Sequence, residues 1–157
     1  MTPPKHSAKI ERLKKRRQFL AVAQGLSCAR GAVLIQDLPR PSTQEPAELS
    51  QVSDPIIGLG FTATKRLGNA VVRNRAKRRL REAARLLTPL HAEPGHDYVF
   101  VARNGAPNRP WARLLDDVKT ALLTLAAGRG DPPRPARPNQ SRDGRSGRSK
   151  PAPSSSR

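Results

Sequence analysis

A cationic segment at residues 68–85, GNAVVRNRAKRRLREAAR, constrains the fold of this chain more than any other feature. Seven of its eighteen residues are Arg or Lys, and only Glu82 is acidic. Apolar residues recur through it at steps of three and four, the spacing that places side chains on one face of an α-helix. The segment therefore predicts a helix that packs by one side and is cationic on the other. Its apolar face comprises Val72, Ala76, Leu80, Ala83 and Leu87.

The ends of this helix are marked by residues that favour helix termini. Asn69 is a suitable N-cap, and Pro89 lacks the N–H needed to continue the helix, so we expect the helix to end just before it. Lys77, Arg81 and Arg85 form an uncompensated row at i,i+4 spacing. Like charges at that spacing repel one another, so a cationic row combined with an apolar face favours a phosphate-binding helix over a merely solvated one.

The whole chain is basic, with a net charge of +18 over 157 residues. Such a charge favours binding to a nucleic-acid backbone, and an anionic membrane surface is the alternative by charge alone. No apolar run approaches the ~20 residues of a membrane-spanning helix, and the N-terminus lacks the apolar stretch of a secretory signal. Cys28 is the only cysteine, which excludes an intramolecular disulfide and a Cys-rich metal site. We therefore expect a cytoplasmic protein without a membrane partner.

Composition divides the chain into a flexible N-terminus (residues 1–8), a single RNA-binding domain (9–127) and a C-terminal tail (128–157). The tail is rich in Gly, Pro, Ser and Arg, with eight basic and two acidic residues, and we expect it to be disordered. Residues 1–127 contain the other 22 basic and 10 acidic residues, so the folded part is basic in its own right. Within it, the proline-rich and acidic segment 39–55 predicts an exposed insertion that does not contact RNA.

The remaining segments predict an α+β fold in the order α-β-β-α-β-α. A first helix is expected at 9–25, followed by a strand at 31–38. The alternating segment 56–64 predicts a second strand with one apolar and one small-residue face. A third strand is expected at 96–103 and a last helix at 111–127. Together with the cationic helix, these elements would form a small mixed β-sheet packed by helices.

A search for catalytic residues finds no constellation that could cleave RNA. Protein nucleases use convergent carboxylates that bind metal ions, or paired acid–base groups. His96 and Asp97 form the only suggestive pair, but neighbouring strand residues point to opposite faces. Aromatic residues make up 3% of the chain, so base stacking cannot be widespread. Phe19 is the best candidate for stacking, and core packing is an equally good interpretation of it.

The stretch GFTATKRLGNAVVRNRAKRRLREAAR, residues 60–85, closely resembles the signature of the bacterial ribonuclease P protein family. Weaker agreement extends over residues 9–127. The resemblance implies the protein subunit of an RNA-based endonuclease, whose RNA subunit, with bound Mg²⁺, removes the 5′ leader of precursor tRNA. It also implies a left-handed βαβ crossover around the cationic helix, against the general right-handed rule. The alternative is a structural RNA-binding protein of ribosomal type without a role in cleavage.

The resemblance also implies roles for individual residues. The protein would bind the catalytic RNA and precursor tRNA, would be inactive alone, and would contribute no catalytic residue and no metal ligand. A cleft for the leader would lie between the first helix and the sheet, with Arg16, Arg17 and Phe19 at its wall. The chain departs from the family in having Ala23 where a second aromatic is frequent. The implied RNA-binding residues are Lys65, Arg66, Asn69, Arg73, Asn74, Arg75, Lys77, Arg78, Arg79 and Arg81.

Overall fold

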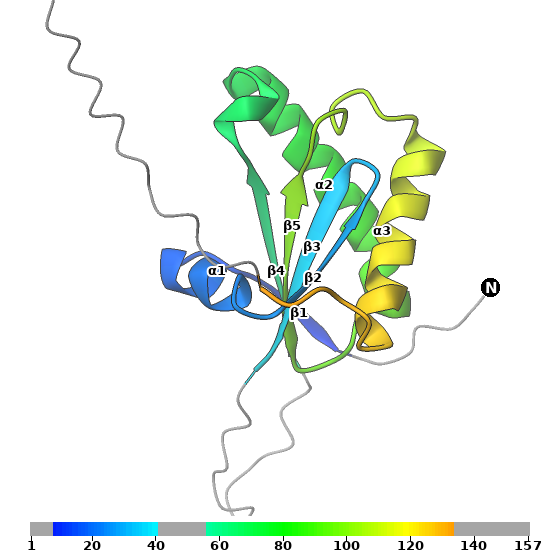
Figure 1. The fold of residues 1–157 in the computed structure, drawn as a ribbon. Helices are drawn as coiled ribbons and strands as arrows, with labels where there is room; N and C mark the ends of the chain where they lie inside the picture. The colour runs from blue at the N-terminus through cyan, green and yellow to red at the C-terminus, as the bar shows by residue number, and fades with distance from the viewer. Residues whose placement is uncertain (1–7, 41–55, 134–157) are drawn as a thin grey trace, which may run out of the picture.

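A five-stranded mixed sheet with helices on both faces forms the centre of the computed structural model, which describes residues 8–40 and 56–133 (Figure 1). The predicted α+β class with a small mixed sheet is confirmed. In the sheet order β1-β4-β5-β3-β2, the pairs β1–β4 and β4–β5 are parallel and the other two are antiparallel. The elements are β1 (Lys9–Arg12), α1 (Arg16–Val22), β2 (Leu26–Arg30), β3 (Val33–Pro39), β4 (Ile56–Ala63), the 3₁₀ helix η1 (Lys65–Leu67), α2 (Ala70–His91), β5 (His96–Ala102) and α3 (Trp111–Ala126).

The neighbouring parallel strands β4 and β5 are connected by α2. In Figure 1 both strands point upward, β5 lies to the right of β4, and α2 lies behind the sheet. A connection that moves to the right through a helix behind the sheet is left-handed, whereas nearly all βαβ units are right-handed. The crossover implied by the resemblance is therefore present.

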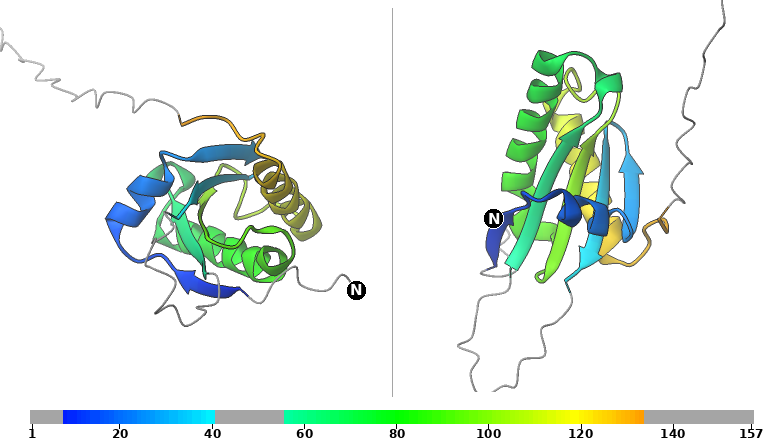
Figure 2. Two further views of the ribbon diagram at one scale, coloured as in Figure 1. Left: turned by 90° about the horizontal axis from the view of Figure 1, so that it is seen from below. Right: turned by 90° about the vertical axis from the view of Figure 1, so that its left-hand side faces the viewer.

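The two faces of the sheet differ in how they are covered (Figure 2). The long helices α2 and α3 cover one face and enclose the main core, in which Leu80, Phe100 and Leu114 are fully buried. The short helix α1 covers the other face over a small cluster centred on Leu13 and Val99. The alternation of side chains along each strand produces this division. No helix within the described ranges is long and apolar enough to cross a membrane.

The predicted first helix at 9–25 is wrong at both ends. Lys9–Arg12 is the edge strand β1, which pairs with β4, and α1 covers only Arg16–Val22. Leu26–Arg30 is an unpredicted strand, β2, which contains the buried Cys28 and pairs with β3. Both segments are only four or five residues long, and KIER is mostly charged, so strand pairing decides their conformation rather than local propensity.

The predicted end of the cationic helix is also wrong, because α2 continues through Pro89 to His91. Proline removes one backbone hydrogen bond, to the carbonyl four residues earlier. Here that loss falls in the last turn, where Ala92 N still donates to the Thr88 carbonyl at 3.0 Å. Thr88 and Ala92 are both buried, so packing holds this turn against the core.

The chain beyond α3 packs further than expected. Ser27 of β2 and Asp131 exchange backbone hydrogen bonds of 2.9 and 2.6 Å. A segment predicted to be disordered from residue 128 is thus paired with the sheet as far as Asp131. The remainder of that tail (134–157), most of the predicted insertion (41–55) and nearly all of the N-terminal lead-in (1–7) lie outside the described residues.

Candidate nucleic-acid interface

The inner face of α2 fixes the orientation of the helix. Asn69 caps its N-terminus, with Oδ1 accepting a hydrogen bond from Val72 N at 3.0 Å. Ala76, Leu80 and Ala83 are fully buried against the sheet and α3, as their spacing predicts. Since this face is anchored over about two turns, the residues on the opposite side of the helix point away from the core.

The outer face of α2 carries most of the expected RNA-binding residues. Seven of the expected residues, from η1, the helix cap and α2, are exposed: Lys65, Arg66, Asn69, Asn74, Arg75, Arg78 and Arg81. Arg73, Lys77 and Arg79 are half-buried. Val71 is 76% exposed beside this cationic set, and it lines a hollow of about 360 Å³ with Asn74, Arg75 and Arg78. The outer face therefore presents a basic surface with an apolar contact at its N-terminal end.

Arg79 differs from the other arginines, because its guanidinium is bonded within the protein. Nη1 donates to the Ala106 carbonyl at 2.6 Å, and Nη2 donates to the Arg109 carbonyl. Burial and then the nearby charge of Arg75 lower the pKa of Arg79 from its ordinary value. These contacts join α2 to the loop that precedes α3. Arg79 thus has a structural role that its place in the RNR pattern does not reveal.

Three further α2 arginines lie in distinct surroundings. Nε of Arg73 is buried and has no hydrogen-bond partner within the described residues. The Arg81 guanidinium lies over the Phe61 ring, 5.8 Å from its centroid. Arg85 pairs with Glu82 through Nε at 3.1 Å, and this bond holds the pKa of the Glu82 carboxyl below its ordinary value. Glu82 is the only acidic residue of α2, so it alone reduces the positive charge of the outer face.

The expected leader-cleft residues lie on the other side of the sheet. Arg16 and Arg17 are exposed in the first turn of α1. Phe19 is half-buried and packs on the small cluster under α1. A Cβ added at Gly60 would lie 2.6 Å from Cε1 of Phe19, so glycine is needed for the ring to approach the strand. Of the two interpretations of Phe19, base stacking and core packing, core packing describes the buried part of the ring. Figure 2 shows that α1 and α2 lie on opposite faces of the sheet.

The one suggestive acid–base pair separates in the structure. His96 Nδ1 lies 2.7 Å from Asp37 Oδ1, whereas Asp97 accepts a 2.6 Å hydrogen bond from Arg40. Burial raises the pKa of the Asp37 carboxyl, and His96 partly opposes this shift. In the parts of the chain described by the structure, no group of three His, Cys, Asp or Glu side chains could hold a metal ion.

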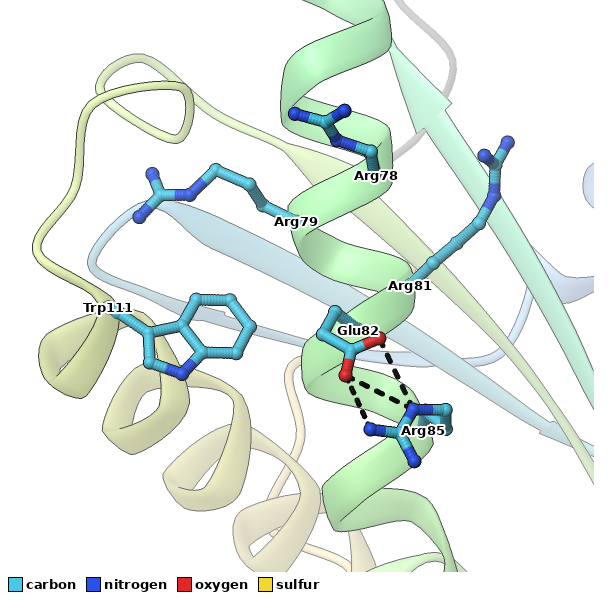
Figure 3. Close-up of a pocket in the computed structure, with 6 residues that line it drawn as sticks. All are labelled: Arg78, Arg79, Arg81, Glu82, Arg85 and Trp111. Atoms are coloured by element: carbon cyan, nitrogen blue, oxygen red, sulfur yellow. Dashed lines mark hydrogen bonds and ion pairs between the residues drawn. The ribbon is translucent and has the colours of Figure 1, made fainter.

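Sequence reasoning missed a second feature of this surface, at the start of α3. Trp111 lines a hollow of about 660 Å³ between α2 and α3, opposite a row of charged α2 residues (Figure 3). It is the only tryptophan, and it follows Pro110 directly, so its residue type and position were the available signal. The other lining residues are Arg78, Arg79, Arg81, Glu82 and Arg85.

Sequence reasoning also missed the contacts that hold the start of α3. Asp117 accepts two hydrogen bonds from Arg109, at 2.6 and 3.0 Å, and one from the backbone of Ala32 at 3.2 Å. The carboxylate thereby connects the loop before α3 to the β2–β3 turn. Gly31 in that turn has φ +48°, and a Cβ there would lie 2.2 Å from an Asp117 oxygen. This network and the Arg79 bonds together position Trp111.

Comparisons with known proteins identify a consistent set of relatives. Residues 8–126 match the family model described as Ribonuclease P. The chain is 57% identical over 127 residues to the "Ribonuclease P protein component" of Caulobacter vibrioides, covering 81% of this chain and 78% of that protein. It is 42% identical to the protein of the same name from Ruegeria pomeroyi, covering 77% of this chain and 90% of that protein.

Solved structures share the fold. The RNase P protein of Staphylococcus aureus superposes with a TM-score of 0.56 at 23% identity, covering 76% of this chain and 97% of that chain. The RNase P protein of Thermotoga maritima gives a TM-score of 0.56 at 21% identity, covering 72% of this chain and 96% of that chain. At these identities the structural similarity speaks for the architecture alone.

Proposed function

This chain belongs to the ribonuclease P protein family, and we propose that the outer face of α2 is the surface by which it binds RNA. As the protein subunit of an RNA-based endoribonuclease, it acts with an RNA subunit in the removal of the 5′ leader from precursor tRNA. The ribosomal-type alternative is not favoured, because the family match extends over residues 8–126 rather than the basic helix alone.

The exposed cations of an anchored helix are the observation that carries the proposed RNA surface. Arg75, Arg78 and Arg81 are exposed on α2, while the opposite side of the same turns is buried in the core. A rigid helix holds these groups at fixed spacing, which reduces the entropy lost on binding. Guanidinium groups also match the geometry of phosphate oxygens. Lys65 and Arg66 of η1 extend the same cationic surface before α2.

We assign the leader contact to α1 and the adjoining sheet face. Arg16 and Arg17 are exposed there and would contact leader phosphates. Phe19 would act mainly as a wall, since its ring packs against the strand at Gly60. With Ala23 one turn later in place of an aromatic, stacking on this face would be limited and contacts to the backbone more important.

The family implies Mg²⁺, whose protein ligands would be mainly carboxylates. The carboxylates and imidazoles described by the structure form no group suited to a metal ion, and several are already bonded to cations or to each other. We therefore propose that the RNA subunit chiefly binds the Mg²⁺, while the basic protein surface reduces repulsion between RNA chains. We also propose a cytoplasmic location, which is compatible with the bacterial ribonuclease P proteins that the chain resembles.

Reconstitution tests this function directly. The full chain is combined with a bacterial ribonuclease P RNA, and cleavage of precursor tRNA is measured over a series of Mg²⁺ concentrations. We expect stimulation of 5′ maturation at low Mg²⁺, a smaller stimulation with the double variant Arg75→Ala/Arg78→Ala, and no cleavage by the protein alone. Binding of the RNA without any effect on cleavage at every Mg²⁺ concentration would support the ribosomal-type alternative. Site-specific cleavage without RNA that is lost in His96→Ala would place a catalytic residue in the protein.

A further inference from the structure

We propose that the hollow between α2 and α3 binds a single unpaired nucleotide of RNA, with the base stacked on Trp111 and a neighbouring phosphate held by Arg78. This inference rests on the proposed function, because it needs an RNA partner. It adds a contact on α3 to the cationic face of α2, and it assigns a base to a surface whose other proposed contacts are to phosphates.

Trp111 is more exposed than any of the phenylalanines or the single tyrosine. Its relative exposure is 37%, compared with 1% for Tyr98 and 0% for Phe100, and the other two phenylalanines are half-buried. A large apolar ring at the rim of a hollow costs free energy in water unless a partner covers it. An indole surface is well suited to a nucleobase, because every base offers a π-face for stacking.

The ring is held in place before any ligand arrives. Arg79 lies with its guanidinium carbon 6.0 Å from the centroid of the indole, and its nitrogens are bonded to the carbonyls of Ala106 and Arg109. Arg109 is in turn fixed by Asp117. Figure 3 shows the indole projecting from the first turn of α3 toward α2, with Arg79 beside it. A platform that is already ordered loses little conformational freedom when a base binds.

The charge around the hollow selects an anion. The lining contains four arginines and one acid, and that acid, Glu82, is already paired with Arg85. Arg78 is exposed and its guanidinium makes no hydrogen bond or ion pair with another described residue, so it stays available for a phosphate. The volume of about 660 Å³ lies within the range of roughly 300–1,000 Å³ found for small-ligand sites. One nucleotide therefore suits the hollow better than a duplex, whose bases are stacked inside.

Continuity with the outer face of α2 favours RNA over a free anion. Arg78 lines both this hollow and the smaller one formed with Val71, Asn74 and Arg75. An RNA strand bound along α2 by its phosphates would pass Arg78 and could place one unstacked base beside Trp111. The base could come from the catalytic RNA or from precursor tRNA, so the experiment below tests the two separately.

Intrinsic fluorescence provides the first test, because Trp111 is the only tryptophan in the chain. The full-length protein is titrated with ribonuclease P RNA in one arm and with precursor tRNA in the other. Stacking should quench the emission and protect it from acrylamide at saturation. Quenching in either arm supports the proposal and identifies the RNA that supplies the base. Unchanged emission and unchanged acrylamide access in both arms would overturn it.

Substitutions provide the second test, with RNA affinity measured over a series of salt concentrations. Trp111→Leu should weaken binding about 5- to 100-fold, as expected for one lost stacking contact, and Trp111→Phe should restore most of it. The salt dependence should stay unchanged in Trp111→Leu, because no phosphate contact is lost. Arg78→Ala should instead flatten it by about one unit of slope. Leu123→Ala, also on α3 and 46% exposed, is the matched control and should bind normally.

The outcomes separate this proposal from the function on which it rests. If wild-type protein stimulates precursor-tRNA cleavage while Trp111→Leu, folded by its melting temperature, binds both RNAs like wild type, the nucleotide site is wrong and the function stands. If Trp111→Leu does not fold, the fluorescence titration of the wild-type protein decides whether the nucleotide site exists. If wild-type protein fails to stimulate cleavage, the function itself is overturned.

Discussion

Arg75 and Arg79 lie one turn apart on α2, yet these two arginines have different roles. Arg75 is exposed beside Asn74 and Arg78. Its guanidinium makes no hydrogen bond or ion pair with another described residue. Arg79 donates to two backbone carbonyls of the loop before α3. The basic composition of the helix therefore overstates its RNA contacts, because part of the charge holds the fold together. The inner face, the Arg79 bonds and the outer face should respond differently to substitution.

The inner face should show the largest effect on stability. Leu80 is fully buried, so Leu80→Ala should lower the free energy of unfolding by ~2–5 kcal/mol through the lost burial and the cavity. RNA affinity should follow only as the folded fraction falls. Denaturant unfolding checks this, with Leu86→Ala, 41% exposed on the same helix, as the control that should change little. An unchanged unfolding midpoint in Leu80→Ala would mean that α2 faces the other way.

Arg79→Ala should have the next largest effect, and this effect should be a loss of stability. Removing the guanidinium leaves the carbonyls of Ala106 and Arg109 without their donors, at a cost of ~1–3 kcal/mol. Arg79→Lys should recover only part of this, because a single ammonium group cannot reproduce the planar fork. The measurements are thermal unfolding and the salt dependence of RNA binding. A normal melting temperature combined with a flatter salt dependence would show that Arg79 binds RNA as Arg75 is proposed to do.

Arg75→Ala should change binding and leave stability within about 0.5 kcal/mol, as for most exposed positions. Each lost phosphate contact should reduce the slope of log affinity against log salt by about one unit. Arg75→Lys should restore the slope and only part of the affinity, since lysine acts as a point charge. Binding titrations at several salt concentrations, together with melting curves, test this. Unfolding of Arg75→Ala would abolish the distinction from Arg79.

Glu82→Gln should have the smallest effect, a modest gain in RNA affinity. The change frees Arg85 from its partner and removes the only acid from the outer face of α2. Arg85 lowers the pKa of Glu82 from 4.5, so the charged pair is complete above that value and is lost as pH falls through the lowered pKa. The gain should therefore be present at neutral pH and disappear as pH falls through the lowered pKa, where wild-type Glu82 becomes protonated too. Weaker binding by Glu82→Gln at neutral pH would show that the Glu82–Arg85 pair itself contacts RNA.

The sequence was sufficient for the parts of the fold that repeat a pattern. The inner face of α2 follows from the spacing of Ala76, Leu80 and Ala83, and the cap from Asn69. The strands β3, β4 and β5 follow from apolar alternation or apolar runs, and burial confirms them. In these segments local preference and tertiary packing agree, which is the condition for a reliable prediction.

The failures occur where a distant partner decides the outcome. The segment KIER at Lys9–Arg12 resembles a charged helix turn, and only pairing with β4 makes it a strand. Arg79 is indistinguishable from Arg78 in sequence, because its partners lie about thirty residues away. Trp111 was placed on a helix correctly, but its exposure depends on the loop and on α2. The RNA-binding residues of α2 stay predictions that the substitutions above test, and the leader-cleft residues on α1 stay predictions as well.

The order of strands in the sheet decides when this chain can fold during its synthesis. β1, β2 and β3 leave the ribosome first, yet β1 lies at one end of the sheet and β3 pairs with β2 and β5 toward the other. β4 and β5 connect the two ends, and both come later in the chain. Asp117, which accepts from the backbone of Ala32, is 85 residues downstream of it. Only the β2–β3 hairpin can pair early, so the domain assembles after nearly all of it has been translated.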